Sequence, residues 1–296
     1  MKKAYAFAIL ASLFWGAGFI GSKYALTGFD AMWVTFFRFF IATVFLLPFV
    51  VTSNLSEFSF KFFRKSFFCG FLLMIMMFLQ IKGIEYTTIA KSGFITTTHA
   101  FITPILSYIL FKDHLTKFFL SMVAMSFAGI ALLCEMDFSS LNLGDLLTFL
   151  GAVCTSFQLI YLSHSLSKIK NIALFNLIQM FAVSFSAFIF AVLFEGIEPL
   201  WNLTLYTNTN AVNGLVFMGV FSTTIAFYLQ VRCQKHLKGH VAGVIYLIES
   251  PIAAVLGFIF FKEALSPQGV FGSFLVMLAI VLLLFEKELK KKFITF

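Results

Sequence analysis

Charged side chains are scarce in this sequence. Asp, Glu, Lys and Arg together make up 11% of its 296 residues, and 60% of the residues are hydrophobic. Soluble domains carry roughly 25% charged residues, so the composition excludes an ordinary soluble protein. The apolar runs are long and unbroken, with a mean hydropathy of +0.98, whereas the strands of a membrane barrel alternate. The sequence therefore predicts an all-α integral membrane protein.

The sequence also lacks the motifs of membrane proteases and ATP-driven pumps. It contains no HExxH, no glycine-rich phosphate loop and no GxSxG. Its four cysteines fall singly within or at the ends of apolar stretches, which predicts free thiols rather than a metal or redox pair; they are Cys69, Cys134, Cys154 and Cys233. We therefore expect no enzyme, no cofactor and no bound metal. Any transport must be driven by a gradient or by exchange.

Ten apolar stretches are long enough to span a membrane. An α-helix crosses the ~30 Å hydrocarbon layer in about 20 residues. The first stretch is kept as a helix because no small-residue cleavage site of a signal peptide follows it. Short connections, the longest at residues 52–66 and 195–210, leave no domain outside the membrane. The predicted spans are residues 4–26, 31–51, 67–84, 89–111, 115–134, 144–163, 172–194, 211–231, 240–261 and 267–285.

Basic residues predict the orientation, because Lys and Arg accumulate in cytoplasmic loops. With the N-terminus inside, most loop lysines and arginines lie on one side, and Lys262 is the clear exception. We therefore expect a multi-pass protein of the cytoplasmic (inner) membrane with both termini cytoplasmic. The net charge of +8 indicates contact with anionic membrane lipid and gives no support to nucleic-acid binding.

The chain repeats a pattern at an interval of 150 residues. Ser92-Gly93, His99 and the segment 112–116 correspond to Ala242-Gly243, Glu249 and the segment 262–266. Five helices in each half would give the second half the opposite orientation, which is a common transporter architecture. The alternative is a chance recurrence of helix ends in apolar sequence. We predict two inverted five-helix repeats, at residues 1–138 and 139–296.

Several short segments follow one another in a recognisable order and spacing. They are residues 14–19, Arg38, 83–88 and 91–94 in the first half, and Gln179, 228–230, Gln234, 249–251 and 261–263 in the second. Together they resemble one known family, the EamA-type members of the drug/metabolite transporter superfamily, over nearly the whole length. The resemblance implies ten helices, with helices 1 to 4 and 6 to 9 around a central cavity and helices 5 and 10 at the periphery. His99 departs from the commonest family pattern.

Small residues recur every fourth position in the first predicted helix. Side chains of this size let another helix backbone approach closely. We predict that this ridge packs inside the bundle; it consists of Ala4, Ala8, Ser12 and Gly16.

Glu249 lies near the middle of a predicted span, where a carboxylate is costly and needs a reason. It could bind a proton, pair with a cationic group of a substrate, or pair with the protein. Arg38 is the arginine placed well inside a predicted span, so it is the candidate protein partner. The alternative role is a structural ion pair or hydrogen bond that fixes the helix.

His99 is more ambiguous, because a single histidine in a helix is commonly a satisfied core residue. Its correspondence to Glu249 favours a role in substrate binding or proton coupling, and a shared cavity would couple the two titrations.

Other polar or aromatic side chains in the spans are candidates for substrate contact. Amides donate and accept hydrogen bonds, which suits a zwitterionic metabolite, but they also join helix to helix. Aromatic faces suit an organic cation. The candidates are Gln80, Gln158, Gln179 and Gln230, with Trp15 and Tyr228.

Pro104 and Pro251 predict interruptions in two helices, since proline removes a backbone donor and clashes with the preceding turn. A kinked helix can move as a gate, or the kink can be a static bend.

Together these features predict a secondary transporter that moves small amino-acid-like metabolites by alternating access, as an exporter or exchanger. Uptake of a nucleoside-like or sulfonium metabolite is the alternative within this class. From other classes, a lipid flippase, a membrane partner without transport and a membrane enzyme stay open, and so does a homodimer through the peripheral helices. The proposed cavity depends on His99, Arg38 and Glu249 lying together.

Overall fold

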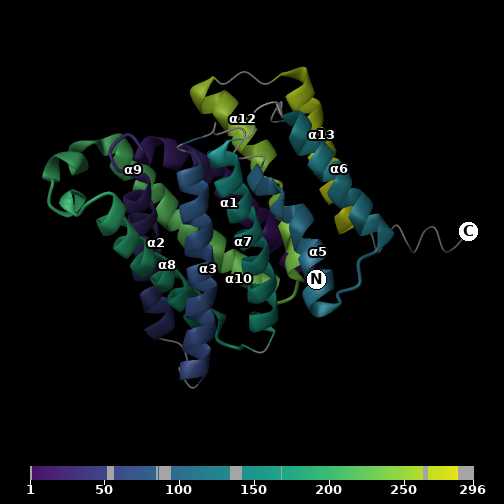
Figure 1. Cartoon of the computed structure of the whole chain (residues 1–296), viewed down its shortest axis with the longest axis horizontal. Helices are drawn as coiled ribbons and strands as arrows, with labels where there is room; N and C mark the ends of the chain where they lie inside the picture. Colours follow the sequence, from purple (N-terminus) through teal and green to yellow (C-terminus); the bar gives the residue numbers. More distant parts are fainter. Residues whose placement is uncertain are drawn as a thin grey trace, which may run out of the picture.

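The computed structural model describes residues 2–51, 57–84, 86, 95–133, 142–167, 169–262 and 266–285, and these form a bundle of helices (Figure 1). Seven helices are uninterrupted: α1 (Lys2–Ala25), α2 (Ala31–Val51), α3 (Phe60–Ile84), α6 (Lys117–Leu133), α7 (Leu143–Leu166), α8 (Ile172–Phe194) and α13 (Pro267–Leu284). The others are α5 (His99–Phe111), the continuous series α9 (Thr209–Phe217), η3 (Met218–Ile225) and α10 (Ala226–Gln234), and the pair α11 (Gly239–Tyr246) and α12 (Glu249–Phe261). Short 3-10 turns η1 (Glu198–Leu200) and η2 (Leu203–Thr207) precede α9.

Eight helical segments of the described part are long and apolar enough to cross a membrane, and shorter apolar helices cover 95–111 and 117–132. The expected spans therefore recur as helices wherever the structure describes them. The start of the third helix was predicted wrongly. Ser59 Oγ accepts the N–H of Phe62 at 3.2 Å, so a serine cap starts α3 at Phe60 rather than at residue 67.

Two of the apolar helices are interrupted at corresponding places. Thr98 separates residues 95–97 from α5, and Leu247 and Ile248 separate α11 from α12. Hydrogen bonds of the three-residue type run through both breaks, from Phe101 N–H to the Thr98 carbonyl and from Ile248 N–H to the Ile245 carbonyl. The interruptions lie before Pro104 and Pro251, which themselves sit inside α5 and α12.

The two half-helices that follow these breaks also end alike. Lys112 and Lys262, which are 150 residues apart in the sequence, both have a left-handed backbone with φ of 55°. In each case the lysine N–H bonds back to the last turn of its helix.

The helices pack in a small number of close pairs. α3 lies against α7 and α8, α2 lies against α8 and η3, and α1 lies against α9, α10 and α12. α6 and α13 pack together at one edge of the bundle (Figure 1). The small-residue ridge of α1 is buried as predicted, and Ser12 Oγ lies 3.4 Å from the Ile245 carbonyl.

The middle of the α9–α10 series is a π-helix. Thr224 Oγ1 donates to the Gly219 carbonyl, five residues earlier, at 2.7 Å. π-Turns occur as local insertions in α-helices, often at functional sites. A Cβ at Gly219 would lie 2.6 Å from Ile41 of α2, so glycine lets α2 approach the π-helix.

Candidate functional site

Glu249 and Arg38 bring opposite formal charges into the interior of the bundle, although the two described side chains form no ion pair within 4.0 Å. Glu249 is the first residue of α12, directly after the break, and Arg38 comes from α2. Both side chains keep some accessible surface. A carboxylate and a guanidinium that stay partly accessible can bind the two ends of a zwitterion, or hold each other.

The π-helix orients Arg38. Arg38 Nε donates to Thr223 Oγ1 at 2.9 Å, and the guanidinium carbon lies 5.3 Å from the centre of the Phe39 ring. Thr223 is fully buried, so its hydroxyl is unavailable to water. Sequence reasoning missed Thr223, because apolar periodicity gives no signal for a π-turn.

Trp15 lies in an aromatic group beside the same break. Its ring centre is 4.9 Å from that of Tyr246 and 5.3 Å from that of Phe227, and both pairs meet edge to face. Tyr246 is the last residue of α11, three positions before Glu249. The aromatic group therefore lies beside the helix break that precedes Glu249. Tyr246 was not among the sequence-predicted residues.

His99 occupies in α5 the position that Glu249 occupies in α12, but its surroundings differ. Nδ1 lies 2.8 Å from the Thr96 carbonyl, and the ring also contacts the Gly243 backbone. The residue is 9% exposed. The structure therefore places His99 in the contact between α5 and α11, with its ring engaged by backbone groups.

The backbone carbonyls of His99 and Glu249 each lie close to a small residue of another helix. Ser156 Oγ of α7 donates to the His99 carbonyl at 3.2 Å. A Cβ at Gly16 of α1 would lie 3.0 Å from the Glu249 carbonyl. A small residue of α1 and a small residue of α7 thus approach corresponding carbonyls.

Two of the predicted glutamines, Gln80 and Gln158, lie in different parts of the bundle. Gln80 is partly exposed, and its amide donates to Thr96 Oγ1 at 3.0 Å, directly before the first helix break. Gln158 is buried and lies 3.6 Å from Cys69 Sγ. Gln80 therefore lies at the level of the break, whereas Gln158 lies between α7 and α3.

Buried amides of α8 and α10 leave polar atoms without hydrogen-bond partners among the described residues. Both amide atoms of Asn176 and Gln179 are in this state, and so is the carbonyl oxygen of Gln230 and of Gln234. All four side chains are at most 3% exposed. Unpaired buried polar groups cost about 1–3 kcal/mol each. We call Gln158, Asn176, Gln179, Gln230 and Gln234 the amide group.

Tyr228 lies away from the charged pair. Its hydroxyl accepts hydrogen bonds from Arg232 Nε at 3.2 Å and Nη2 at 2.8 Å, in an exposed position near the end of α10. The structure therefore brings together Arg38, Glu249 and Trp15, but not Tyr228.

A polar cluster joins α5 to α11 at one end of the bundle. Asp113, directly after α5, accepts from Lys238 and from Ser107. His240 Nδ1 lies 3.2 Å from Ser107 Oγ. Burial works against ionisation of Asp113, but hydrogen bonds from Lys238 and Ser107 outweigh it and lower the pKa of Asp113. Sequence reasoning used Asp113 only as a repeat marker.

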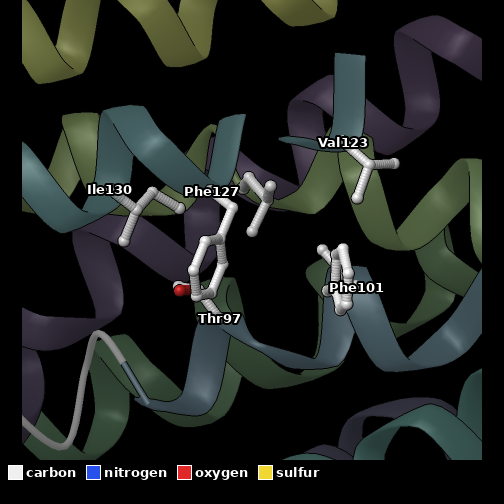
Figure 2. Close-up of a pocket in the computed structure, with 7 residues that line it drawn as sticks. Thr97, Phe101, Val123, Phe127 and Ile130 are labelled. Carbon is white, nitrogen blue, oxygen red and sulfur yellow. The ribbon is translucent and has the colours of Figure 1, made fainter. Parts of the chain in front are cut away.

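A small apolar pocket, too tight to hold a water molecule, lies beside the breaks. Figure 2 shows Phe127 of α6 next to Thr97, with Phe101 and Val123 facing each other. Leu247 also lines it. This pocket is a packing defect where α5, α6 and α11 meet, and it offers no charged group to a substrate.

The model of the EamA-like transporter family matches residues 2–134 and residues 142–285. The chain belongs to the EamA-like transporter family. This EamA-like chain is 30% identical, over 274 residues, to an uncharacterized transporter from Archaeoglobus fulgidus, covering 92% of this chain and 83% of that relative. A crystal structure of another protein matches 97% of this chain and 99% of its own, with a TM-score of 0.80 and 14% identity. That likeness shows the fold alone. The chain is thus a multi-pass membrane transporter.

Proposed function

We propose that this EamA-like protein is a secondary transporter that binds a small zwitterionic, amino-acid-like metabolite between Arg38 and Glu249. The observation that carries the proposal is the placement of two oppositely charged side chains in the bundle interior: Glu249 is the first residue after a helix break, and Arg38 is oriented by its hydrogen bond to Thr223. Arg38 would bind the carboxylate of the substrate, and Glu249 its ammonium group. Trp15 and Tyr246 would cover the side chain of the substrate.

The proposed mechanism is alternating access between two inverted five-helix halves, residues 1–138 and 139–296. Reciprocal capping supports this symmetry. Glu57, after α2, accepts the Asn171 N–H before α8 at 2.7 Å. Glu195, after α8, accepts the Met32 and Trp33 N–H groups at the start of α2, at 2.9 and 3.1 Å. Each of these two helices is therefore capped by the acidic residue that follows the other.

The packing of the two ends supports one closed gate. α11 lies against α5 and α7, whereas α12 lies against α1 and α13. Gln234 Nε2 donates to the Leu159 carbonyl at 2.9 Å, and Gly239 contacts the same backbone. We infer that Asp113 and Lys238 close this end, and that opening it would hydrate the amide group and make it part of the substrate path.

The basic residues of this end support its assignment to the cytoplasm. We therefore propose an inner-membrane protein with both termini in the cytoplasm, acting as an exporter or an exchanger. His99, held by backbone groups, would act as a joint between α5 and α11. Its protonation would then change helix contacts rather than bind the substrate directly.

The test is a thermal-stability screen of purified protein against amino acids and related zwitterions, followed by flux in proteoliposomes. Wild type should be stabilised by the substrate and should transport it. Glu249→Gln should lose both effects, because the ammonium group loses its counter-ion. Glu198→Gln, at an exposed carboxylate between α8 and α9, is the matched control and should behave like wild type.

A ligand that stabilises wild type and Glu249→Gln equally would give Glu249 a structural role. Absence of any ligand or flux would contradict transport of zwitterions. Flux of a nucleoside-like or sulfonium compound in its place would redefine the substrate, and lipid scrambling without solute flux would favour a flippase.

A further inference from the structure

A basic pocket of about 650 Å³ lies away from Arg38 and Glu249, where the ends of α1, α8 and α10 meet. Ligand pockets typically measure about 300–1,000 Å³, so its size suits a bound group. The side chains that line it are Lys2, Lys3, Ala4, Phe7, Ile172, Arg232, Lys235 and His236.

The positive charge of this pocket is not balanced by the described part of the chain. Lys2, Lys3, Arg232 and Lys235 form no ion pair with a carboxylate among the described residues. Glu57 approaches the neighbouring Asn171, but its carboxylate is occupied by backbone N–H groups. Four clustered cations with no counter-ion in the described part of the chain favour an anionic ligand.

Arg232 is held in place by the protein. Two of its nitrogens donate to the Tyr228 hydroxyl, and its guanidinium carbon lies 5.2 Å from the centre of the Tyr228 ring. The remaining guanidinium donors stay available for phosphate oxygens, which arginine binds in a bidentate way.

Apolar side chains continue from this pocket along α1 towards η3. Phe7 lines the pocket, and Leu10 on the next turn is 42% exposed. Phe14 and the 40% exposed Phe221 stack with ring centres 6.0 Å apart. A polar, basic end joined to an exposed apolar strip matches an amphipathic molecule.

We propose that this pocket binds the phosphate headgroup of an anionic phospholipid, whose acyl chains lie along Phe7, Leu10 and Phe14. Basic pockets between transmembrane helices on the cytoplasmic side recognise such headgroups. The lipid site is separate from the proposed substrate site. It would hold α1 against α10 and would make the stability of the transporter depend on anionic lipid.

The experiment titrates detergent-purified protein with phosphatidylglycerol, phosphatidylcholine or soluble glycerol phosphate, and counts bound lipid by native mass spectrometry. The pocket variant is Lys3→Gln/Arg232→Gln/Lys235→Gln. The control variant, Lys61→Gln/Arg64→Gln/Lys117→Gln, removes three exposed charges from the same end of the bundle. The single variant Lys3→Gln, at an exposed helix start, repeats the test with minimal disturbance of folding.

Wild type should bind phosphatidylglycerol in preference to phosphatidylcholine. The pocket variant should bind it on the order of 100-fold more weakly, Lys3→Gln several-fold more weakly, and the control within about threefold of wild type. Equal losses in pocket and control variants would overturn the proposal in favour of a diffuse charge effect. If soluble glycerol phosphate bound as tightly as phosphatidylglycerol, the ligand would be a free phosphate compound, and the assignment to a lipid would be overturned.

Discussion

Arg38 and Glu249 each have the other as an opposite charge in the interior, so their contributions to stability are coupled. Removing one of the two side chains leaves the other charge in the interior without its opposite charge, which lowers stability. Thr223 satisfies Arg38 only in part, through Nε. The two charges therefore either bind a zwitterion or, when no substrate is bound, stabilise each other.

We predict that Arg38→Met lowers the free energy of unfolding by about 1–3 kcal/mol, because the buried Thr223 hydroxyl loses its partner and Glu249 loses its opposite charge, and that adding Glu249→Gln recovers part of this loss. The reason is that the second change removes the unpaired charge. A double-mutant cycle from denaturant unfolding in detergent measures the coupling. Strictly additive losses would contradict the coupling.

A second prediction at the residue scale concerns the ionisation of Asp113 and its effect on stability. Because its pKa is lowered in the folded protein, its ionised form contributes stability above the ordinary Asp pKa of about 4, and that contribution is lost as pH falls through the folded value. Asp113→Asn should lower stability at pH 7 by about 2 kcal/mol. Lys238→Met should cost about 0.5 kcal/mol, because the Lys238 side chain is 57% exposed.

Thermal unfolding at pH 7 and in acid measures both effects. The difference between wild type and Asp113→Asn should shrink in acid. A difference that stays constant with pH would contradict an ionised Asp113. Asp113→Asn should also open the end of the bundle that α5 and α11 close, and so raise modification of the buried Cys233.

At the scale of elements, the contact between α1 and the π-helix depends on glycine. A Cβ at Gly18 would overlap the side chain of Ser222, and the atoms in its way belong to Ser222 alone. The π-turn sets this register and also places Thr223 against Arg38. Packing of α1 and orientation of Arg38 are therefore linked.

Gly18→Ala should lower the free energy of unfolding by about 1–3 kcal/mol through overpacking and should reduce flux. Gly18→Ala/Ser222→Gly should recover most of the loss, apart from about 1 kcal/mol for glycine within a helix. Unfolding and flux measured on the single and double variants test this. Failure of Ser222→Gly to restore either property would show that the overlap is not the cause.

At the scale of the whole molecule, the two proposed halves should behave as separate units that assemble. We predict that residues 1–138 and 139–296, co-expressed as two chains, form a complex with transport activity, since each half supplies a cap to the other. Reporter fusions should place both outer ends of the chains in the cytoplasm. A reporter at residue 139 located in the cytoplasm would contradict the inverted arrangement, because five helices separate it from the N-terminus.

The sequence by itself determined that the chain is helical and membrane-embedded. Apolar runs of spanning length leave helices as the way to pair every backbone group in lipid. Where the structure describes the helix ends, the same runs located them to within a few residues, except at Phe60, where a serine cap extends α3. The predicted start at residue 89 and the predicted end at residue 134 lie outside the described residues. The 150-residue spacing pointed to Glu249 and His99, and a charge inside an apolar run pointed to Arg38.

Only the tertiary structure decided which of these residues meet. Arg38, Thr223 and Glu249 come from helices far apart in the sequence, and their proximity depends on how α1, α2 and the π-helix pack. The corresponding positions 99 and 249 have different surroundings: the Thr96 carbonyl engages the His99 ring, whereas Glu249 shares the bundle interior with the opposite charge of Arg38. The unpaired amides and the basic pocket also arise from contacts between distant helices, which local apolar periodicity does not encode.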